Sequence, residues 1–214
     1  TKKAQLDQDF TTSQLSVDSL GELGGQIDHN RLISDSVALR INAMVERLDN
    51  HRDFYDGDRI GVNPTLHIES GDSVIGLSYE YVDHQRFIDR GIPTGSDGRP
   101  VEAFQKIVFG DPDVNTTALK AHLWRASVQH SFSDTLKGNV AAFYGDYDKL
   151  YQNFYAASYD QAQTPDEVTL DGYVDTTQRQ NTILSANLIG ESDFAGMQHT
   201  LLAGVEFIDT SSDQ

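Results

Sequence analysis

The sequence predicts an all-β protein built as an antiparallel up-and-down meander. The clearest observation lies at residues 59–82, where apolar side chains alternate with polar or small ones on both sides of a turn at residues 69–73. A period of two places all the apolar side chains of a strand on one face of a sheet. The same alternation predicts strands at residues 37–48, 117–131, 136–147, 174–189 and 199–208.

The first part of the chain gives a weaker signal. Residues 4–17 and 21–30 are candidate strands, and glycines dilute the second of them. A turn at 32–36 leads into 37–48, for which a helix is the alternative because the segment contains good helix formers; the period-two match favours a strand. Pro64 lies inside the following hairpin and has no N–H for a ladder, so we expect a β-bulge there.

The connections between these strands predict which solvent the apolar faces meet. Short turns, such as 132–135, alternate with longer connections, and the longest are expected at residues 83–116 and 148–173, with a moderate turn at 191–198. In a meander this alternation puts nearly all the loop length at one end of the sheet, which is typical of outer-membrane β-barrels. The sequence therefore predicts part of a transmembrane barrel.

Aromatic residues support the same prediction. Tyr79, Tyr81, Tyr144 and Phe207 lie near the end with the long loops, and Phe132 lies beside a short turn. Two aromatic girdles at the membrane interfaces have this arrangement. The residues expected to face lipid are Leu39, Ile41, Ile75, Leu77, Tyr79, Tyr81, Val140, Tyr144, Leu184, Leu201, Val205 and Phe207. The residues expected to face the lumen or a plug are Arg40, Asn42, Glu46, Ser78, Glu80 and Glu206.

Composition excludes several classes of function. A formal net charge of −17 repels nucleic-acid phosphates, and the absence of cysteine excludes disulfides and thiolate metal sites. No run approaches the ~18 apolar residues that a membrane helix needs. No spacing indicates a catalytic triad or a nucleotide loop, so no enzyme and no catalytic residue is predicted. Asp111–Asn115 begins like an EF-hand loop, but Thr116 and His122 stand where glycine and glutamate are required, so a turn capped by its own side chains is predicted and no metal site.

The loops hold the candidate residues for ligand contact. Exposed aromatic rings can stack on a flat chelate, and arginines can pair with an anionic one. The candidates are Arg86, Arg90, Arg99, Tyr151, Phe154, Tyr155 and Tyr159. Two alternatives stay open: the tyrosines belong equally well to the aromatic girdle and an extended strand, and the arginines can instead pair with nearby aspartates.

The chain also resembles a known family over residues 21–207. The segments that carry the resemblance are RDFYDGDRIGVNPTL (52–66), LSYEYVDHQRFIDRGIP (77–93), GRPV (98–101), FGDPDVN (109–115), HSFSDTL (130–136), GDYDKLYQNFY (145–155) and HTLLAGVEF (199–207). In this order they resemble the barrel of TonB-dependent ferric-siderophore receptors. The resemblance implies a barrel of about 22 strands filled by an N-terminal plug.

On this interpretation residues 1–214 are one partial barrel domain of about eight to ten strands, an excerpt without the plug and the remaining strands. The implied partners are a ferric siderophore, outer-membrane lipid, the receptor's own plug and the TonB complex, in the outer membrane of a Gram-negative bacterium. No cofactor is implied, because the iron arrives inside its chelator. The alternatives are a passive outer-membrane channel and a soluble β-sandwich that binds carbohydrate.

Overall fold

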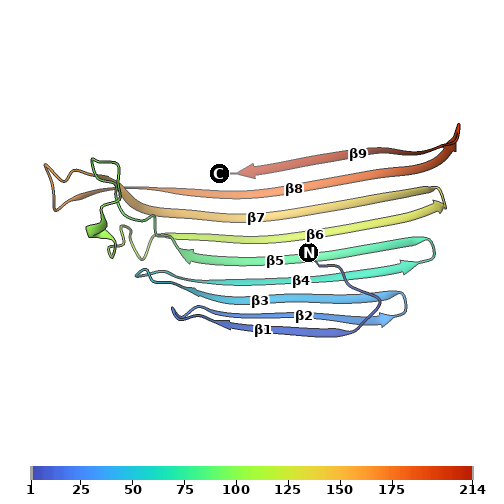
Figure 1. The fold of residues 1–214 in the computed structure, drawn as a ribbon, viewed down its shortest axis with the longest axis horizontal. Coiled ribbons are helices and arrows are strands. Elements are labelled where there is room, and N and C mark those ends of the chain that lie inside the picture. The colour runs from blue at the N-terminus through green and yellow to red at the C-terminus, as the bar shows by residue number, and fades with distance from the viewer. Residues whose placement is uncertain (1, 214) are drawn as a thin grey trace.

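The computed structural model describes residues 2–213. Within this range nine antiparallel strands form one sheet, and each strand pairs with the next in the sequence (Figure 1). The elements are β1 (Phe10–Val17), β2 (Leu23–Ser34), β3 (Val37–Asp49), β4 (Asp56–Ser70), β5 (Ser73–Phe87), the 3₁₀ turn η1 (Glu102–Phe104), β6 (Thr116–Ser133), β7 (Leu136–Tyr159), β8 (Val168–Phe194) and β9 (Met197–Asp213). The predicted meander is confirmed, and the helical alternative for residues 37–48 is wrong.

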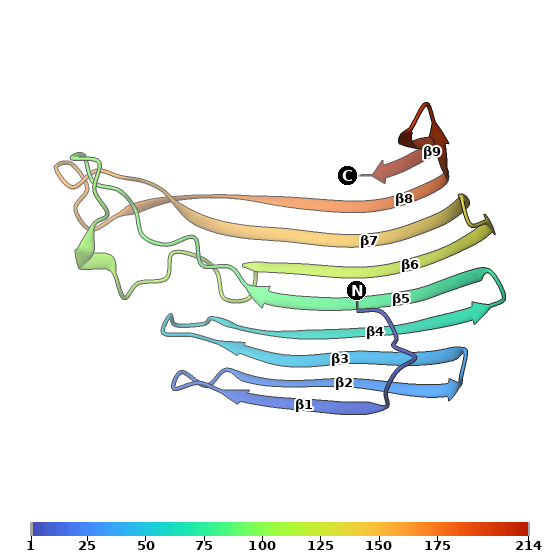
Figure 2. The ribbon, with the colours of Figure 1, turned by 45° about the vertical axis from the view of Figure 1, so that its right-hand side comes forward.

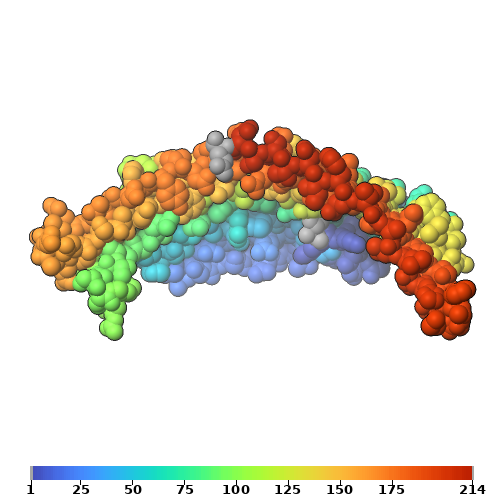
Figure 3. Space-filling model, turned by 90° about the horizontal axis from the view of Figure 1, so that it is seen from above, coloured from blue at the N-terminus to red at the C-terminus, as the bar shows by residue number. Residues whose placement is uncertain are grey.

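The sheet is a single curved layer, concave on one side and convex on the other (Figure 3). Residues 2–9 run across the concave face before β1 begins (Figure 1). No helix in residues 2–213 is long and apolar enough to cross a membrane. The buried apolar side chains among the described residues are few, and large ones such as Leu201 and Val205 are 73% and 70% exposed. A face this apolar is expected only where something other than water covers it.

Loop length is strictly segregated between the two ends of the sheet. The turns at one end span only residues 35–36, 71–72, 134–135 and 195–196. The connections at the other end span residues 18–22, 50–55, 88–115 and 160–167. Ala195 and Gly196 both have positive φ, 54° and 76°, as a two-residue hairpin turn requires. The predicted moderate turn at 191–198 is therefore wrong in length.

The predicted second long loop, 148–173, is also wrong. β7 continues to Tyr159 and β8 begins at Val168, so only residues 160–167 connect them. Beyond the apolar band this hairpin carries polar residues on both faces, such as Lys149 and Asp175 on one and Asp148 and Gln178 on the other. Without apolar alternation, a strand cannot be recognised by its period.

The bulge predicted at Pro64 is absent. Val62 pairs with Tyr81 and Thr65 with Ser78, so the register is the same on both sides of the proline. Pro64 cannot donate to the carbonyl of Tyr79, and the side-chain Nδ2 of Asn63 donates to that carbonyl instead, at 2.6 Å. A side chain thus replaces the missing backbone donor, and the strand needs no extra residue.

Candidate functional site

The strand registers place all twelve residues expected to face lipid on the convex face. In the row Leu77–Ala126–Ala142–Leu184–Phe207 each residue pairs with the next strand. Trp124 joins Tyr79 and Tyr144 through ring centroids 5.3 and 5.5 Å apart, and Tyr79 Oη lies 2.7 Å from His122 Nδ1. The sequence analysis did not name Trp124 or His122 in this cluster.

The aromatic residues on this face form two levels, one toward each end of the sheet. The distance between the two levels is close to the thickness of the apolar part of a membrane. Trp124 and Phe132 are both on β6, eight residues apart, which is about 27 Å along the strand at ~3.4 Å per residue. At the ~35–45° tilt of strands in membrane barrels, this corresponds to a height of about 19–22 Å. The apolar band of outer-membrane barrels is about 25 Å tall. The convex face therefore matches the lipid-facing surface of such a barrel.

The opposite face carries the residues expected to face the lumen. Arg40, Asn42 and Glu46 share it on β3, as do Ser78 and Glu80 on β5 and Glu206 on β9. Several of them are paired there: Glu46 accepts from Arg59, and Glu80 accepts from Arg125 Nη1 at 3.1 Å. A polar, ion-paired surface of this kind is typical of the inside of a barrel.

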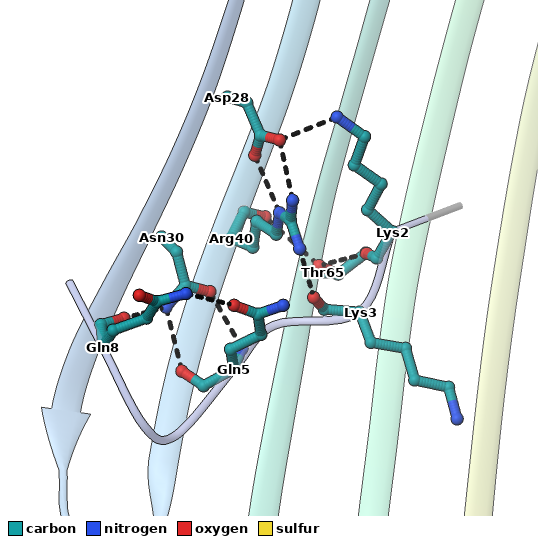
Figure 4. Close-up of polar contacts among 8 residues, drawn as sticks. All are labelled: Lys2, Lys3, Gln5, Gln8, Asp28, Asn30, Arg40 and Thr65. Carbon is teal, nitrogen blue, oxygen red and sulfur yellow. Dashed lines mark hydrogen bonds and ion pairs between the residues drawn. The ribbon is translucent and has the colours of Figure 1, made fainter. Parts of the chain in front are cut away.

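The N-terminal segment, residues 2–9, is fastened to this inner face (Figure 4). Arg40 donates two hydrogen bonds of 2.7 Å to Asp28 and a third, of 2.9 Å, to the carbonyl of Lys3. Asn30 accepts from the Gln5 amide at 2.9 Å and donates to the carbonyls of Gln5 and Gln8. Side chains of the sheet thus provide hydrogen-bond partners for the backbone groups of residues 2–9, which need no neighbouring strand. The strand predicted at residues 4–17 therefore begins only at Phe10.

Replacing Arg40 with methionine is expected to loosen this segment. The side chain of Arg40 is only 10% exposed, and its loss leaves the Lys3 carbonyl without its donor and the Asp28 carboxylate with Lys2 Nζ alone. Hydrogen exchange at the Gln5 amide should become faster. The control is Arg31→Met, which removes an exposed pair with Asp9 that is worth about 0–1 kcal/mol. Equal exchange rates in the two variants would show that Arg40 does not hold the segment.

A cluster of one cation and three phenols lies on the inner face at the end with the long loops. Arg90 Nη1 lies 3.0 Å from Tyr173 Oη, and the Arg90 guanidinium carbon is 5.1 Å from the Tyr155 ring centroid. The Tyr151 and Tyr173 rings stack with centroids 5.7 Å apart. Hydrogen bonding to Tyr173, and then to Tyr151, raises the pKa of Arg90, so the cation is permanent. We call Arg90, Tyr151, Tyr155 and Tyr173 the mouth cluster.

Of the seven predicted ligand residues, the structure brings Arg90, Tyr151 and Tyr155 together in the mouth cluster. The other four lie outside it. Arg86 shares the inner face and pairs with Thr117, which pairs with Tyr151. Arg99 is exposed near the tip of the loop 88–115. Phe154 has the opposite parity on β7, so its side chain leaves the cluster. A bulge between Ala156 and Ser158 shifts the register before Tyr159, whose ring packs on Phe104.

The loop 88–115 is held against the ends of β7 and β8 (Figure 2) by two residues that the sequence analysis did not identify. Asn115, 2% exposed, donates to the carbonyls of Ile88 and Phe154, both at 2.9 Å, and accepts from the Phe154 amide at 2.8 Å. Arg52 donates to Asp89 and to the carbonyls of Gln105 and Ile107. Most of these partners are backbone groups, which carry no signal in the sequence; the exception is the Asp89 carboxylate. The predicted capped turn is confirmed, because the Asp113 amide donates to Asp111 Oδ1 at 2.9 Å.

Comparison with known proteins identifies solved structures that share this fold. No protein-family model matches the chain, and no curated protein matches its sequence. Solved structures do match. The ferric-catecholate import receptor Fiu of Escherichia coli K12 is 22% identical with a TM-score of 0.84, over 99% of this chain and 35% of its own. The siderophore receptor PiuA of Acinetobacter baumannii is 18% identical with a TM-score of 0.87, over 100% of this chain and 32% of its own.

A third match is the ferripyoverdine receptor of the Pseudomonas aeruginosa outer membrane, bound to ferripyoverdine. It is 16% identical with a TM-score of 0.85, over 98% of this chain and 28% of its own. The chain has the fold of a siderophore-receptor barrel. It spans about a third of the length of these receptors.

Proposed function

We propose that this chain is a wall segment of a TonB-dependent outer-membrane receptor that takes up ferric siderophores. The observation that carries the proposal is the mouth cluster, which lies on the inner face at the long-loop end of a receptor-barrel fold. A permanent cation flanked by aromatic rings suits an anionic, flat chelate. The predicted alternative in which the loop arginines pair with aspartates does not describe Arg90, whose partners are tyrosines.

The two free sheet edges support a larger barrel. Within residues 2–213, β1 pairs only with β2 and β9 only with β8. A membrane barrel must close, because an edge in lipid leaves backbone groups without hydrogen bonds. We infer that further strands of the intact receptor pair with both edges, and that this segment is one domain together with them.

The proposed mechanism is capture and transport, without catalysis. The chelate binds between the outer loops and the plug, and energy from the TonB complex moves the plug so that the chelate passes. The iron is cargo held by its own ligand, so this wall needs neither a metal site nor a cofactor. The soluble-sandwich alternative is wrong, because no second sheet covers the convex face of residues 2–213. No feature of this wall favours a passive channel.

Replacing Arg90 with alanine is expected to weaken chelate binding about tenfold, because a hydrogen bond to a charged group contributes about 1.5 kcal/mol or more. The measurement is fluorescence quenching of the intact receptor in detergent, titrated with the ferric complex of N-(2,3-dihydroxybenzoyl)glycine. Arg99→Ala is the matched control, since Arg99 lies on the same loop outside the mouth cluster. Wild-type affinity in Arg90→Ala would remove the cluster from the binding site.

A further inference from the structure

Asn153 lies in the middle of the mouth cluster and is buried. On β7 it is two residues from both Tyr151 and Tyr155, so it shares their face, and it pairs directly with Tyr173 on β8. Only 2% of Asn153 is exposed. A buried carboxamide with two donor hydrogens and an acceptor oxygen thus lies between three tyrosines of the mouth cluster in the strand register.

The hydrogen-bonding capacity of this carboxamide is unused. Among residues 2–213, neither Nδ2 nor Oδ1 of Asn153 has a hydrogen-bond partner. The two other asparagines that are equally buried are well paired: Asn30 holds Gln5 and Gln8, and Asn115 holds Ile88 and Phe154. Buried amides in folded proteins nearly always have partners, and an unpaired one costs about 1–3 kcal/mol. The exception at Asn153 therefore points to a partner that is not part of this wall.

The loop 88–115 is bonded to the residues next to and opposite Asn153. Asn115 ties the end of this loop to the backbone of Phe154, the residue after Asn153, and Arg90 near its start reaches Tyr173, the residue opposite. Between these ends, residues 96–100 are exposed. The middle of the loop is held by Arg52, which donates to the carbonyls of Gln105 and Ile107, so opening the loop requires these contacts to break while the strands below stay paired.

We propose that Asn153 is a specificity-determining contact for the chelate. This role rests on the receptor function proposed above. Asn153 Nδ2 donates to an anionic oxygen of the ligand, and Asn153 Oδ1 accepts from an amide N–H of the ligand. The ligand class is then a ferric chelate that carries both anionic oxygens and amide N–H groups. The ligand gains access when the contacts that hold the middle of the loop 88–115 open while Arg90 and Asn115 keep its two ends in place, and it satisfies the amide that the wall leaves unpaired.

The experiment uses two variants of the intact receptor, Asn153→Leu and Asn153→Asp. Leucine keeps a similar size without polar atoms, and aspartate adds a negative charge at the same position. The probe is the gallium or ferric complex of N-(2,3-dihydroxybenzoyl)glycine, with Asn139→Leu at the far end of β7 as the control. We expect Asn153→Leu to bind about tenfold more weakly and Asn153→Asp more weakly still, because its carboxylate repels the anionic oxygens. Hydrogen exchange of the loop 88–115 should stay at the wild-type rate in Asn153→Leu.

The outcomes separate this inference from the proposed function. If Arg90→Ala binds weakly and both Asn153 variants bind like wild type, the site is correct and the role of Asn153 is wrong. Faster exchange of the loop in Asn153→Leu would make the residue structural and would also overturn the inference. A wild-type receptor that binds no ferric chelate would overturn the proposed function and this inference together.

Discussion

Replacing Val140 with arginine is expected to destabilise the barrel in a bilayer by about 2–4 kcal/mol, the usual cost of arginine at the membrane midplane. Val140 is 58% exposed on the convex face and pairs with Val128, which is four residues from both Trp124 and Phe132. The substitution therefore places a charge halfway between the two aromatic levels. The measurement is a urea titration of the intact receptor folded into phospholipid vesicles.

Asn139→Arg is the matched control for this substitution. Asn139 precedes Val140 on the same strand and pairs with Gln129, so its side chain lies on the inner face. The same charge there meets a polar lumen, and we expect a change below about 1 kcal/mol. Equal destabilisation by the two variants would mean that the convex face is not the lipid-facing one.

Replacing Asn115 with alanine is expected to cost about 3 kcal/mol and to release the loop 88–115. The substitution removes two donors to carbonyls and two bonds accepted from the amides of Asp111 and Phe154. Each bond contributes about 1 kcal/mol, and buried partners left unpaired cost more. The measurement is the rate of limited proteolysis within the loop, together with hydrogen exchange at the Phe154 amide.

The control for Asn115→Ala is Asn187→Ala, at a half-buried position on β8 remote from the loop. Asn115→Asp adds a sharper comparison: it keeps the acceptor for the Phe154 amide but cannot donate to the Ile88 carbonyl. We expect Asn115→Asp to loosen the loop nearly as much as alanine. If the protease cleaves the loop of both Asn115 variants at the wild-type rate, Arg52 alone holds the loop in place.

The missed length of the β7–β8 hairpin has a clear physical origin. Between the aromatic levels, one face meets an apolar medium and the other a polar one, so Leu184 and Ser185 alternate and the strand is visible in the sequence. At Asp148 and Lys149 both faces are polar, so the sequence predicts a loop where the structure has the hairpin formed by β7 and β8. Backbone pairing is the same in both regions; only the side-chain contrast disappears.

The residues of the candidate site also divide into those that the sequence indicates and those that only the structure reveals. Arg90, Tyr151 and Tyr155 were predicted as ligand residues because of their chemistry, and they do meet. Tyr173 and Asn153 were missed, because their importance comes from the register that places them opposite each other. Phe154 was grouped with its neighbours in the sequence, although adjacent residues of a strand lie on opposite faces.

By itself, the sequence determined the meander, the segregation of loops and the apolar and polar faces, because these follow from local alternation and turn chemistry. Tertiary structure alone decided the length of the β7–β8 hairpin, the path of residues 2–9 across the concave face and the assembly of the mouth cluster. Those features depend on hydrogen bonds between residues distant in the chain, such as Arg40 with Lys3 and Arg90 with Tyr173. Lys3 and Arg90 both lie outside the strands, and the path of such segments leaves no trace in the alternation of side chains that identifies a strand.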